Sequence, residues 1–446
     1  RRGRPRKDST VASGQDLLIR PDPRPRLPDH RGRPGPARPA GTSRRVRRNR
    51  MVASAVVLAL LALSLWLVVG GGHSSTAPPV HHGPDRHPVP VTGRANPRLD
   101  PEWQGDGKPV TMAFGGDVNF PSDSTLGDRL AADPATAMGA GASELLAGVN
   151  LSMVNLETAL TDGTCPDPQP KTYDFYAPSS ALAALRSTGV SLTTEANNHG
   201  EDCGRPGLQM ALSARAQTGY PILGIGQNAA QAFTPFQTVI DGEHIGIIAA
   251  TQVIDSDLQS SWTATTTQPG LASAYDVTDL VSTVEAARRV DDTVIVFLHW
   301  GVELDACPDP LQEPLANELV RAGADVVIGS HAHVLLGGGY LGSAYVDYGL
   351  GNFAFYNTPA PTDQSGSLIV TATGRHVDSV TWRPALIEDE VPVPLSGAAA
   401  TQAVQSWTGG RTCTDLAASP GAPLATRATE TSPAPPAVAQ QLSQDG

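Results

Sequence analysis

Short apolar runs alternate with amphipathic stretches between about residues 108 and 390, and this alternation constrains the fold more than any other feature. The apolar runs have the length and composition of buried strands. They read VTMAF, LSMVNL, VSLTTE, HIGIIAAT, TVIVFLHW, ADVVIGS, AYVDYG, SLIVTATG and VDSVTW. The stretches between them, such as SSALAALRSTG and LQEPLANELVRAG, space apolar residues three to four positions apart and end at Gly or a basic residue, as amphipathic helices do. The sequence therefore predicts an α/β domain over residues 108–390.

Composition changes on both sides of this region, and the flanking segments are predicted to lie outside the folded domain. Residues 1–50 contain sixteen Lys and Arg against four Asp, a net charge of +12, so the rest of the chain carries −24. Such a segment cannot bury enough apolar surface to offset its chain entropy, which predicts a disordered basic tail. Residues 70–107, rich in Pro, Gly and His, are predicted to form a linker. Residues 391–446, dominated by small and polar residues, are predicted to form a low-complexity, mostly disordered tail.

Residues 51–69 contain no charge and are long enough as a helix to cross about 30 Å of hydrocarbon. Five Arg lie in residues 44–50 and no Lys or Arg in residues 70–79, so the positive-inside rule puts the N-terminus in the cytoplasm and the main domain outside. A cleaved signal peptide is the alternative, but GGGHSSTAPP offers no clear cleavage site, which favours a retained signal anchor. We therefore expect a single-pass protein of the cell membrane whose basic tail contacts anionic lipid, and no nucleic-acid partner.

Four cysteines follow the predicted span, namely Cys165, Cys203, Cys307 and Cys413. On the extracytoplasmic side disulfides are expected to form, and four cysteines allow three pairings. No two of them have the CxxC spacing of a zinc knuckle. Cys165 and Cys203 are the preferred pair because both lie in loops that follow neighbouring polar motifs.

Side chains that can bind metal follow most of the predicted strands. They are Asp117, Glu157, Asn198 with its neighbour His199, His299, His331 and His333. In open α/β sheets the carboxyl ends of the strands form the ligand crevice, so five separate segments are expected to bring these side chains to one edge. Taken singly, each residue is explained as a turn, a cap or a core residue. Together they form a mixed oxygen and nitrogen set suited to one or two divalent transition metal ions, Mn, Fe or Zn.

The motifs around these residues read GGDVNF, NLETAL, EANNHGEDCG, HWGVE, GADVVIGSHAHV and DYGLGNF, and they span about residues 110–356. In this order they resemble the motifs of the CapA family of poly-γ-glutamate capsule synthesis proteins. The resemblance implies a calcineurin-like metallophosphatase fold, a four-layer α/β/β/α sandwich. It also implies metal-ligand positions for Asp117, Glu157, Asn198, His299, His331 and His333, and the position of the general acid for His199. Asp202 belongs to the third motif, where shaping the loop is the expected role.

Two motifs depart from the metallophosphatase pattern. Asn119 stands where that superfamily has a His, and Asn155-Leu156-Glu157 stands where it has Gly-Asp-x-x-Asp. An amide oxygen at Asn119 is a weaker ligand than an imidazole, so lower metal occupancy or a single ion is expected.

Two further residues are expected to support the site. Glu303 is a candidate partner that orients His299, because metal-bound imidazoles commonly donate their second N–H to a carboxylate, and a solvated surface Glu is the alternative. Asn352 lies in DYGLGNF, where two Gly predict a tight turn close to the site.

A metal site of this kind predicts Lewis-acid-assisted cleavage of a phosphate ester or a related bond, with His199 as the proton donor. The resemblance implies a process, the synthesis, export or anchoring of poly-γ-glutamate or another acidic envelope polymer, together with other membrane proteins of capsule synthesis. A non-catalytic module that binds polymer or scaffolds membrane partners is the alternative. Asn119 favours that alternative, whereas the intact Asn198-His199 and His331-x-His333 motifs favour an enzyme.

Overall fold

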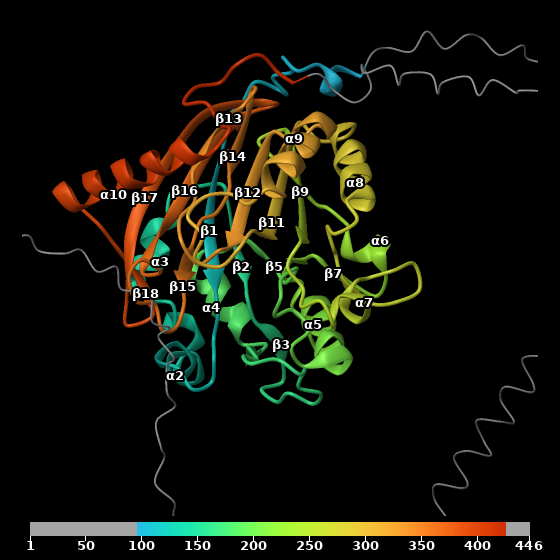
Figure 1. Ribbon diagram of the computed structural model, residues 1–446, viewed down its shortest axis with the longest axis vertical. Coiled ribbons are helices and arrows are strands. Elements are labelled where there is room, and N and C mark those ends of the chain that lie inside the picture. Colours follow the sequence, from blue (N-terminus) through green and yellow to red (C-terminus); the bar gives the residue numbers. More distant parts are fainter. Residues whose placement is uncertain (1–95, 425–446) are drawn as a thin grey trace, which may run out of the picture. The chain divides into compact units, whose positions relative to one another are not determined.

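Two β-sheets form the centre of the domain seen in the computed structural model, which describes residues 96–424 (Figure 1). The larger sheet has the order β18-β17-β16-β1-β2-β5-β6, and β15 pairs with β1. Its strands are β1 Val110–Val118, β2 Leu151–Leu156, β5 Leu192–Thr194, β6 Ile222–Leu223, β15 Asn352–Ala354, β16 Gln364–Thr373, β17 His376–Glu388 and β18 Val391–Pro394.

The smaller sheet has the order β13-β14-β12-β11-β9-β8. Its strands are β8 Phe236–Ile240, β9 Glu243–Thr251, β11 Thr293–Trp300, β12 Val326–His331, β13 Gly338–Leu341 and β14 Ala344–Asp347. Two further pairs join β3 Ala159–Thr161 to β4 Tyr176–Pro178 and β7 Ile225–Gly226 to β10 Gly270–Leu271.

Both sheets contain a run of parallel strands. The smaller sheet is antiparallel at both edges, and the larger sheet is antiparallel only at the edge formed by β16, β17 and β18. Strands β1, β2, β5 and β6 run parallel, as do β9, β11, β12 and β14. In contrast, β16 pairs antiparallel with β1, and β8 pairs antiparallel with β9. Because parallel strands end at the same edge of a sheet, the polar motifs that follow them are brought together there.

Successive residues of the central strands point to opposite faces, and this divides the apolar core into layers. In β11, Ile295 and Phe297 belong to the cluster between the two sheets, which also contains Phe114 of β1. Their neighbours Val296 and Leu298 belong to the cluster on the outer face of the smaller sheet. The continuous apolar runs of the sequence therefore reflect strands buried on both faces.

Helices cover the outer face of each sheet (Figure 1). They are α2 Thr125–Ala132, α3 Gly139–Leu145, α4 Ala181–Thr188, α5 Gly204–Thr218, α6 Ala229–Ala232, α7 Gln259–Trp262, α8 Thr278–Arg288 and α9 Gln312–Ala322. Helices α2 to α5 share a cluster with the larger sheet, and α8 and α9 share one with the smaller sheet. Helices α4 and α9 end, as predicted, at Gly189 and Gly323, whose φ of 99° and 118° disfavours other residues. The predicted α/β class is confirmed, with the layers ordered helices, sheet, sheet, helices.

The predicted disorder of residues 391–446 is wrong for residues 391–424. Strand β18 pairs with β17, and helix α10 Gly397–Gly410 leads into the short 3-10 helix η3 Arg411–Cys413. Leu416 is buried in the outer cluster of the smaller sheet, and Cys413 is bonded to Cys307. This order could not be predicted from the composition. The order depends on contacts with distant residues and not on a periodic spacing of apolar residues within the segment.

The predicted linker over residues 70–107 is also wrong where the structure describes it, from residue 96. The 3-10 helix η1 Pro97–Leu99 and the residues after it are fastened to the domain through Asp292. Arg98 Nε and Trp103 Nε1 each donate to Asp292 Oδ1 over 2.8 Å.

No helix within residues 96–424 is both long and apolar enough to cross a membrane. The predicted span 51–69 and the basic tail before it lie outside the described residues.

Asp347 at the end of β14 predicts a pH-dependent stability of the domain. It is fully buried, its Oδ2 has no hydrogen-bond partner, and burial raises the pKa of its carboxyl to about 7. The folded state therefore holds a proton that the unfolded state has already lost, and wild-type stability falls as pH rises from about 4 to about 7. Relative to wild type, we expect the free energy of unfolding of Asp347→Asn to be about 2–3 kcal/mol higher at pH 8 than at pH 5. The reason is that wild type loses about 1.4 kcal/mol per pH unit below the pKa of Asp347. Urea unfolding at the two pH values measures this gain. Asp128→Asn, at an exposed position of α2, is the control, and an equal gain there would contradict the explanation.

Candidate metal centre

Four strand ends deliver buried metal-capable side chains to one place. Asp117 lies in β1, Glu157 directly follows β2, His299 lies in β11, and His331 ends β12. Each of these four residues is at most 4% exposed. The larger sheet thus supplies the carboxylates and the smaller sheet the imidazoles, so the site lies where the two sheets meet.

The side chains form two overlapping groups whose ligand atoms lie within 4.8 Å of one another. The first contains Glu157, His299 and His331, and the second contains Asp117, Glu157 and His333. His299 Nε2 and His333 Nε2 lie 4.0 and 3.7 Å from Glu157 Oε1. Glu157 is the member that both groups share.

Asn198, which follows β5, adds an oxygen to the first group. Its Oδ1 lies 2.7 Å from His299 Nε2. The structure thus brings together all six residues that the sequence nominated as ligands.

The two histidines of the His331-Ala332-His333 motif belong to different ligand groups. Alternate residues of an extended segment point the same way, but the backbone is not extended at these two residues. Both have positive φ, 97° at His331 and 57° at His333, a backbone region that costs energy for residues other than Gly. This strained turn places one imidazole in each group.

Burial favours the uncharged forms of the titratable side chains in this cluster. It raises the pKa of Glu157 well above its usual range, and the nearby Asp117 carboxylate adds to the effect. It lowers the pKa of His331 to about 3 and that of His299 well below the usual range. The imidazoles are therefore unprotonated near neutral pH, which is the form that binds metal.

The cluster also contains buried polar atoms without partners. Both carboxylate oxygens of Glu157 and the Nδ1 of His331 accept or donate no hydrogen bond. Buried orphan groups of this kind are costly, and a cation between the ligands would satisfy them. The residues therefore fit a divalent transition metal, and their mixture of carboxylate, amide and imidazole suits Mn, Fe or Zn.

Neighbouring strands orient the ligands. Asp117 accepts from Asn155 Nδ2 at 2.8 Å and from the His331 N–H at 3.0 Å. His333 Nδ1 lies 2.9 Å from Asn352 Oδ1, so Asn352 supports the site and Nε2 is left to face Glu157.

Glu303 does not orient His299, so that prediction is wrong. The Glu303 side chain is exposed. His299 Nδ1 instead lies 2.9 Å from Ser330 Oγ and 3.2 Å from Asn155 Nδ2. Ser330 is the residue beside His299 in the parallel register of β11 and β12, a relation that the sequence does not reveal.

Asn119 is buried, but its side chain supports a neighbouring loop. Its Oδ1 accepts the Tyr356 N–H at 3.3 Å, and its Nδ2 has no partner. The second group therefore offers three ligands from Asp, Glu and His, with the Asn119 oxygen already engaged.

His199 is held so that one ring nitrogen faces the cluster. Its Nδ1 lies 2.5 Å from Asp202 Oδ2, and its Nε2 lies 3.8 Å from Glu157 Oε1. The Phe175 ring stacks on the imidazole at 4.2 Å. Burial lowers the pKa of His199, and the Asp202 carboxylate opposes that shift. Asp202 thus does more than shape its loop, because it binds the nitrogen of His199 that faces away from the cluster.

Lys171 is a further residue of the site that was not predicted from the sequence. Its ammonium lies 2.7 Å from Asp202 Oδ1, and its side chain is only 7% exposed. The signal available was its rarity, since Lys171 is the only lysine after residue 108.

Both disulfides join cysteines that are far apart in the chain. Cys165 pairs with Cys203, the preferred pair from the sequence, and Cys307 pairs with Cys413. Cys203 directly follows Asp202 in the chain, so the first disulfide joins the His199 turn to the loop after β3.

A family model described as bacterial capsule synthesis protein PGA_cap matches residues 111–357, more than half of the chain. Two relatives carry related names. The capsule biosynthesis protein CapA of Bacillus anthracis is 31% identical over 190 residues, which cover 42% of this chain and 45% of the relative. The PGA biosynthesis protein CapA of Bacillus subtilis strain 168 is 29% identical over 176 residues, 39% of this chain and 45% of the relative. The matched region thus spans about half the length of these curated relatives.

Solved structures with a similar arrangement include two nucleotidases. The NAD nucleotidase of Haemophilus influenzae has a TM-score of 0.39 at 12% identity and covers 70% of this chain and 57% of its own. The 5'-nucleotidase of Candida albicans SC5314 has a TM-score of 0.36 at 9% identity, over 68% of this chain and 58% of its own.

Proposed function

Because the chain belongs to the family of bacterial capsule synthesis proteins, we propose that it acts in the synthesis, export or anchoring of a poly-γ-glutamate type capsule or envelope polymer through a metal-dependent phosphoesterase-type site. The observation that carries the proposal of a metal-dependent site is that Glu157 belongs to both ligand groups. A carboxylate common to two ligand groups is the arrangement by which two ions are held side by side.

The residues divide into three roles under this proposal. Glu157, Asn198, His299 and His331 hold one divalent transition metal ion, and Asp117, Glu157 and His333 hold a second, more weakly bound one. A metal ion bound there supplies Lewis acidity that polarises a phosphoryl oxygen. For this step His199 is protonated on both ring nitrogens. It delivers the Nε2 proton to the leaving group and returns to the Nδ1-protonated tautomer, whose Nδ1–H donates to Asp202. This assignment gives the domain a calcineurin-like metallophosphatase mechanism.

We extend the proposal to the location and partners of the domain. The uncharged residues 51–69 behind a run of Arg support a signal anchor with the domain outside the cytoplasmic membrane. The two disulfides are consistent with an oxidising compartment. The expected partners are other membrane proteins of capsule synthesis, and the expected substrate is an acidic polymer or a phosphoester.

Metal content tests the site directly. We expect the purified full chain, incubated with Mn²⁺ or Zn²⁺ and desalted, to retain metal in near-stoichiometric amount by elemental analysis. His331→Ala combined with His333→Ala removes one imidazole from each group and is expected to lose that metal. His376→Ala, at an exposed histidine of β17, is the control and should match wild type. A wild type that retains no metal would overturn the proposed site.

A non-catalytic, polymer-binding module is the second candidate, and the engaged oxygen of Asn119 favours it. A domain of this kind would bind poly-γ-glutamate without metal and would release no product from any phosphoester. Sedimentation with the polymer, with and without chelator, distinguishes the two candidates.

A further inference from the structure

Lys171 is a buried cation beside the candidate site. Its Nζ donates to Asp202 Oδ1 at 2.7 Å and to the carbonyl oxygen of Asn198, and it lies 3.3 Å from His199 Nδ1. The ammonium also lies 5.2 Å from the centre of the Trp262 ring, a cation–π contact. One side chain therefore touches a proposed ligand residue, the proposed proton donor and its carboxylate partner.

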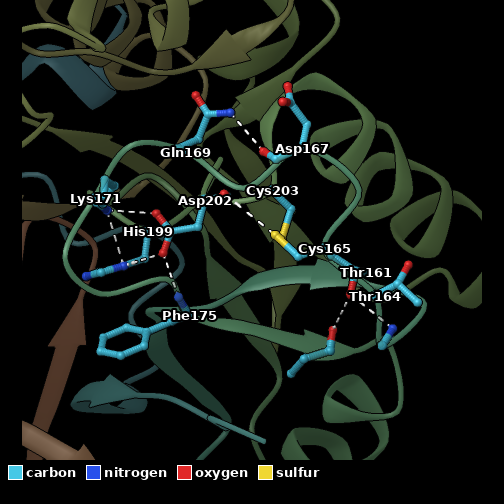
Figure 2. Close-up of a disulfide and its surroundings, with 12 residues drawn as sticks. Thr161, Thr164, Cys165, Asp167, Gln169, Lys171, Phe175, His199, Asp202 and Cys203 are labelled. Atoms are coloured by element: carbon cyan, nitrogen blue, oxygen red, sulfur yellow. Dashed lines mark hydrogen bonds and ion pairs between the residues drawn. A yellow bond between two sulfur atoms is a disulfide. The ribbon is translucent and has the colours of Figure 1, made fainter. Parts of the chain in front are cut away.

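The Asp202 carboxylate receives three donors that fix its orientation. Oδ2 lies 2.5 Å from His199 Nδ1 and accepts the Phe175 N–H at 2.7 Å, while Oδ1 accepts from Lys171. Two of the three donors come from residues 165–175, which we name the strap. Figure 2 shows Lys171 and His199 both directed at the Asp202 carboxylate.

The strap is fastened along the turn that carries Asn198, His199 and Asp202. The Cys165–Cys203 disulfide joins its start to the residue after Asp202 (Figure 2). The Gln169 N–H also donates to the Asp202 carbonyl at 3.0 Å. The covalent bond lies six residues before Lys171, and the Gln169 hydrogen bond lies two residues before it, so both shorten the segment that can move independently.

We propose that Lys171, held in place by the disulfide-fastened strap, is a positioning residue that fixes the tautomer of His199 and the backbone of Asn198. The ammonium holds the Asp202 side chain in one orientation, in which it accepts a hydrogen bond from the Nδ1–H of His199 and leaves Nε2 facing the metal ligands. Its bond to the Asn198 carbonyl holds that residue with its side-chain oxygen near His299. The inference rests on the proposed function only where it assigns proton donation to Nε2 of His199.

The test is the imidazole state of His199 in the metal-free full chain. With ¹⁵N-labelled histidine, we expect wild type to show His199 as a single Nδ1-protonated tautomer, assigned by the signal that His199→Asn removes. Lys171→Met should lose that single state and show a mixture of tautomers, and Lys171→Arg should restore it. Lys108→Met, at an exposed lysine, is the matched control and should match wild type. Should Lys171→Met fail to fold, Lys171→Gln, which keeps N–H donors without the charge, carries the same comparison.

A purely structural lysine would lower stability and leave the tautomer of the folded protein unchanged, so an unchanged His199 signal in folded Lys171→Met would overturn the proposal. A wild-type signal in Cys165→Ala with Cys203→Ala would overturn the part assigned to the disulfide. Mn²⁺ affinity gives a second readout, and we expect Lys171→Met to weaken it about 10-fold or more, as the loss of ligand-supporting contacts does. If wild type binds no Mn²⁺, the proposed function fails, while the tautomer comparison still decides the role of Lys171.

Discussion

Glu157→Gln is expected to lose both metal ions at once, the largest effect of any single substitution in the site. Glu157 is the one residue common to the two ligand groups, and an amide has neither the charge nor the second oxygen that a shared ligand needs. We expect Mn²⁺ affinity to fall by more than about 100-fold, beyond what the loss of a supporting contact costs. Elemental analysis after desalting and calorimetric titration with Mn²⁺ measure the loss.

The same substitution should leave the metal-free protein at least as stable as wild type. The Glu157 oxygens are buried without hydrogen bonds, so the substitution removes a group that is costly to bury when charged. Glu195→Gln is the matched control, because Glu195 is also a fully buried carboxylate without hydrogen bonds but belongs to neither ligand group. Metal loss in both variants would show that the effect is not specific to Glu157.

His199→Asn is expected to separate metal binding from turnover. His199 lies in neither ligand group, and its Nε2 faces Glu157 over 3.8 Å. Metal content should therefore stay at the wild-type amount, while hydrolysis of the best phosphoester found for wild type should fall by about 10²–10⁴-fold, as for the loss of a general acid. The slope of rate against leaving-group pKa should steepen as well, because a poor leaving group depends most on proton donation.

Asp202→Asn provides the control for His199. It removes the charge that orients the imidazole and keeps the imidazole itself, so a smaller loss of rate is expected, again with full metal content. Loss of metal from His199→Asn would instead make His199 a ligand, and an unchanged rate would remove it from the mechanism.

The position of the candidate ligands along the strands could be predicted from the sequence. Asp117, Glu157 and His299 each come at the end of an apolar run, and a strand of that length and pattern has its carboxyl end at the sheet edge whatever its neighbours are. The Gly residues at the ends of α4 and α9 could be predicted for the same reason. Whether a helix ends in a residue with positive φ depends mainly on that residue, and Gly adopts this conformation most readily.

The supporting residues could not be predicted, because strand register selects them. Ser330 reaches His299 since the two lie side by side in β11 and β12, and Asn155 reaches Asp117 by the same relation in β1 and β2. Glu303, four residues after His299 in the chain, was the choice that sequence distance suggested, and it is exposed to solvent.

The sequence by itself determined the α/β class and the residues that gather at one sheet edge, because periodicity and strand ends are properties of short segments. Only the tertiary structure decided that His331 and His333 serve different groups, that Lys171 reaches Asp202, and that residues 391–424 are ordered. Each of these depends on the distance between segments far apart in the chain, and that distance is fixed by packing, which no local pattern records.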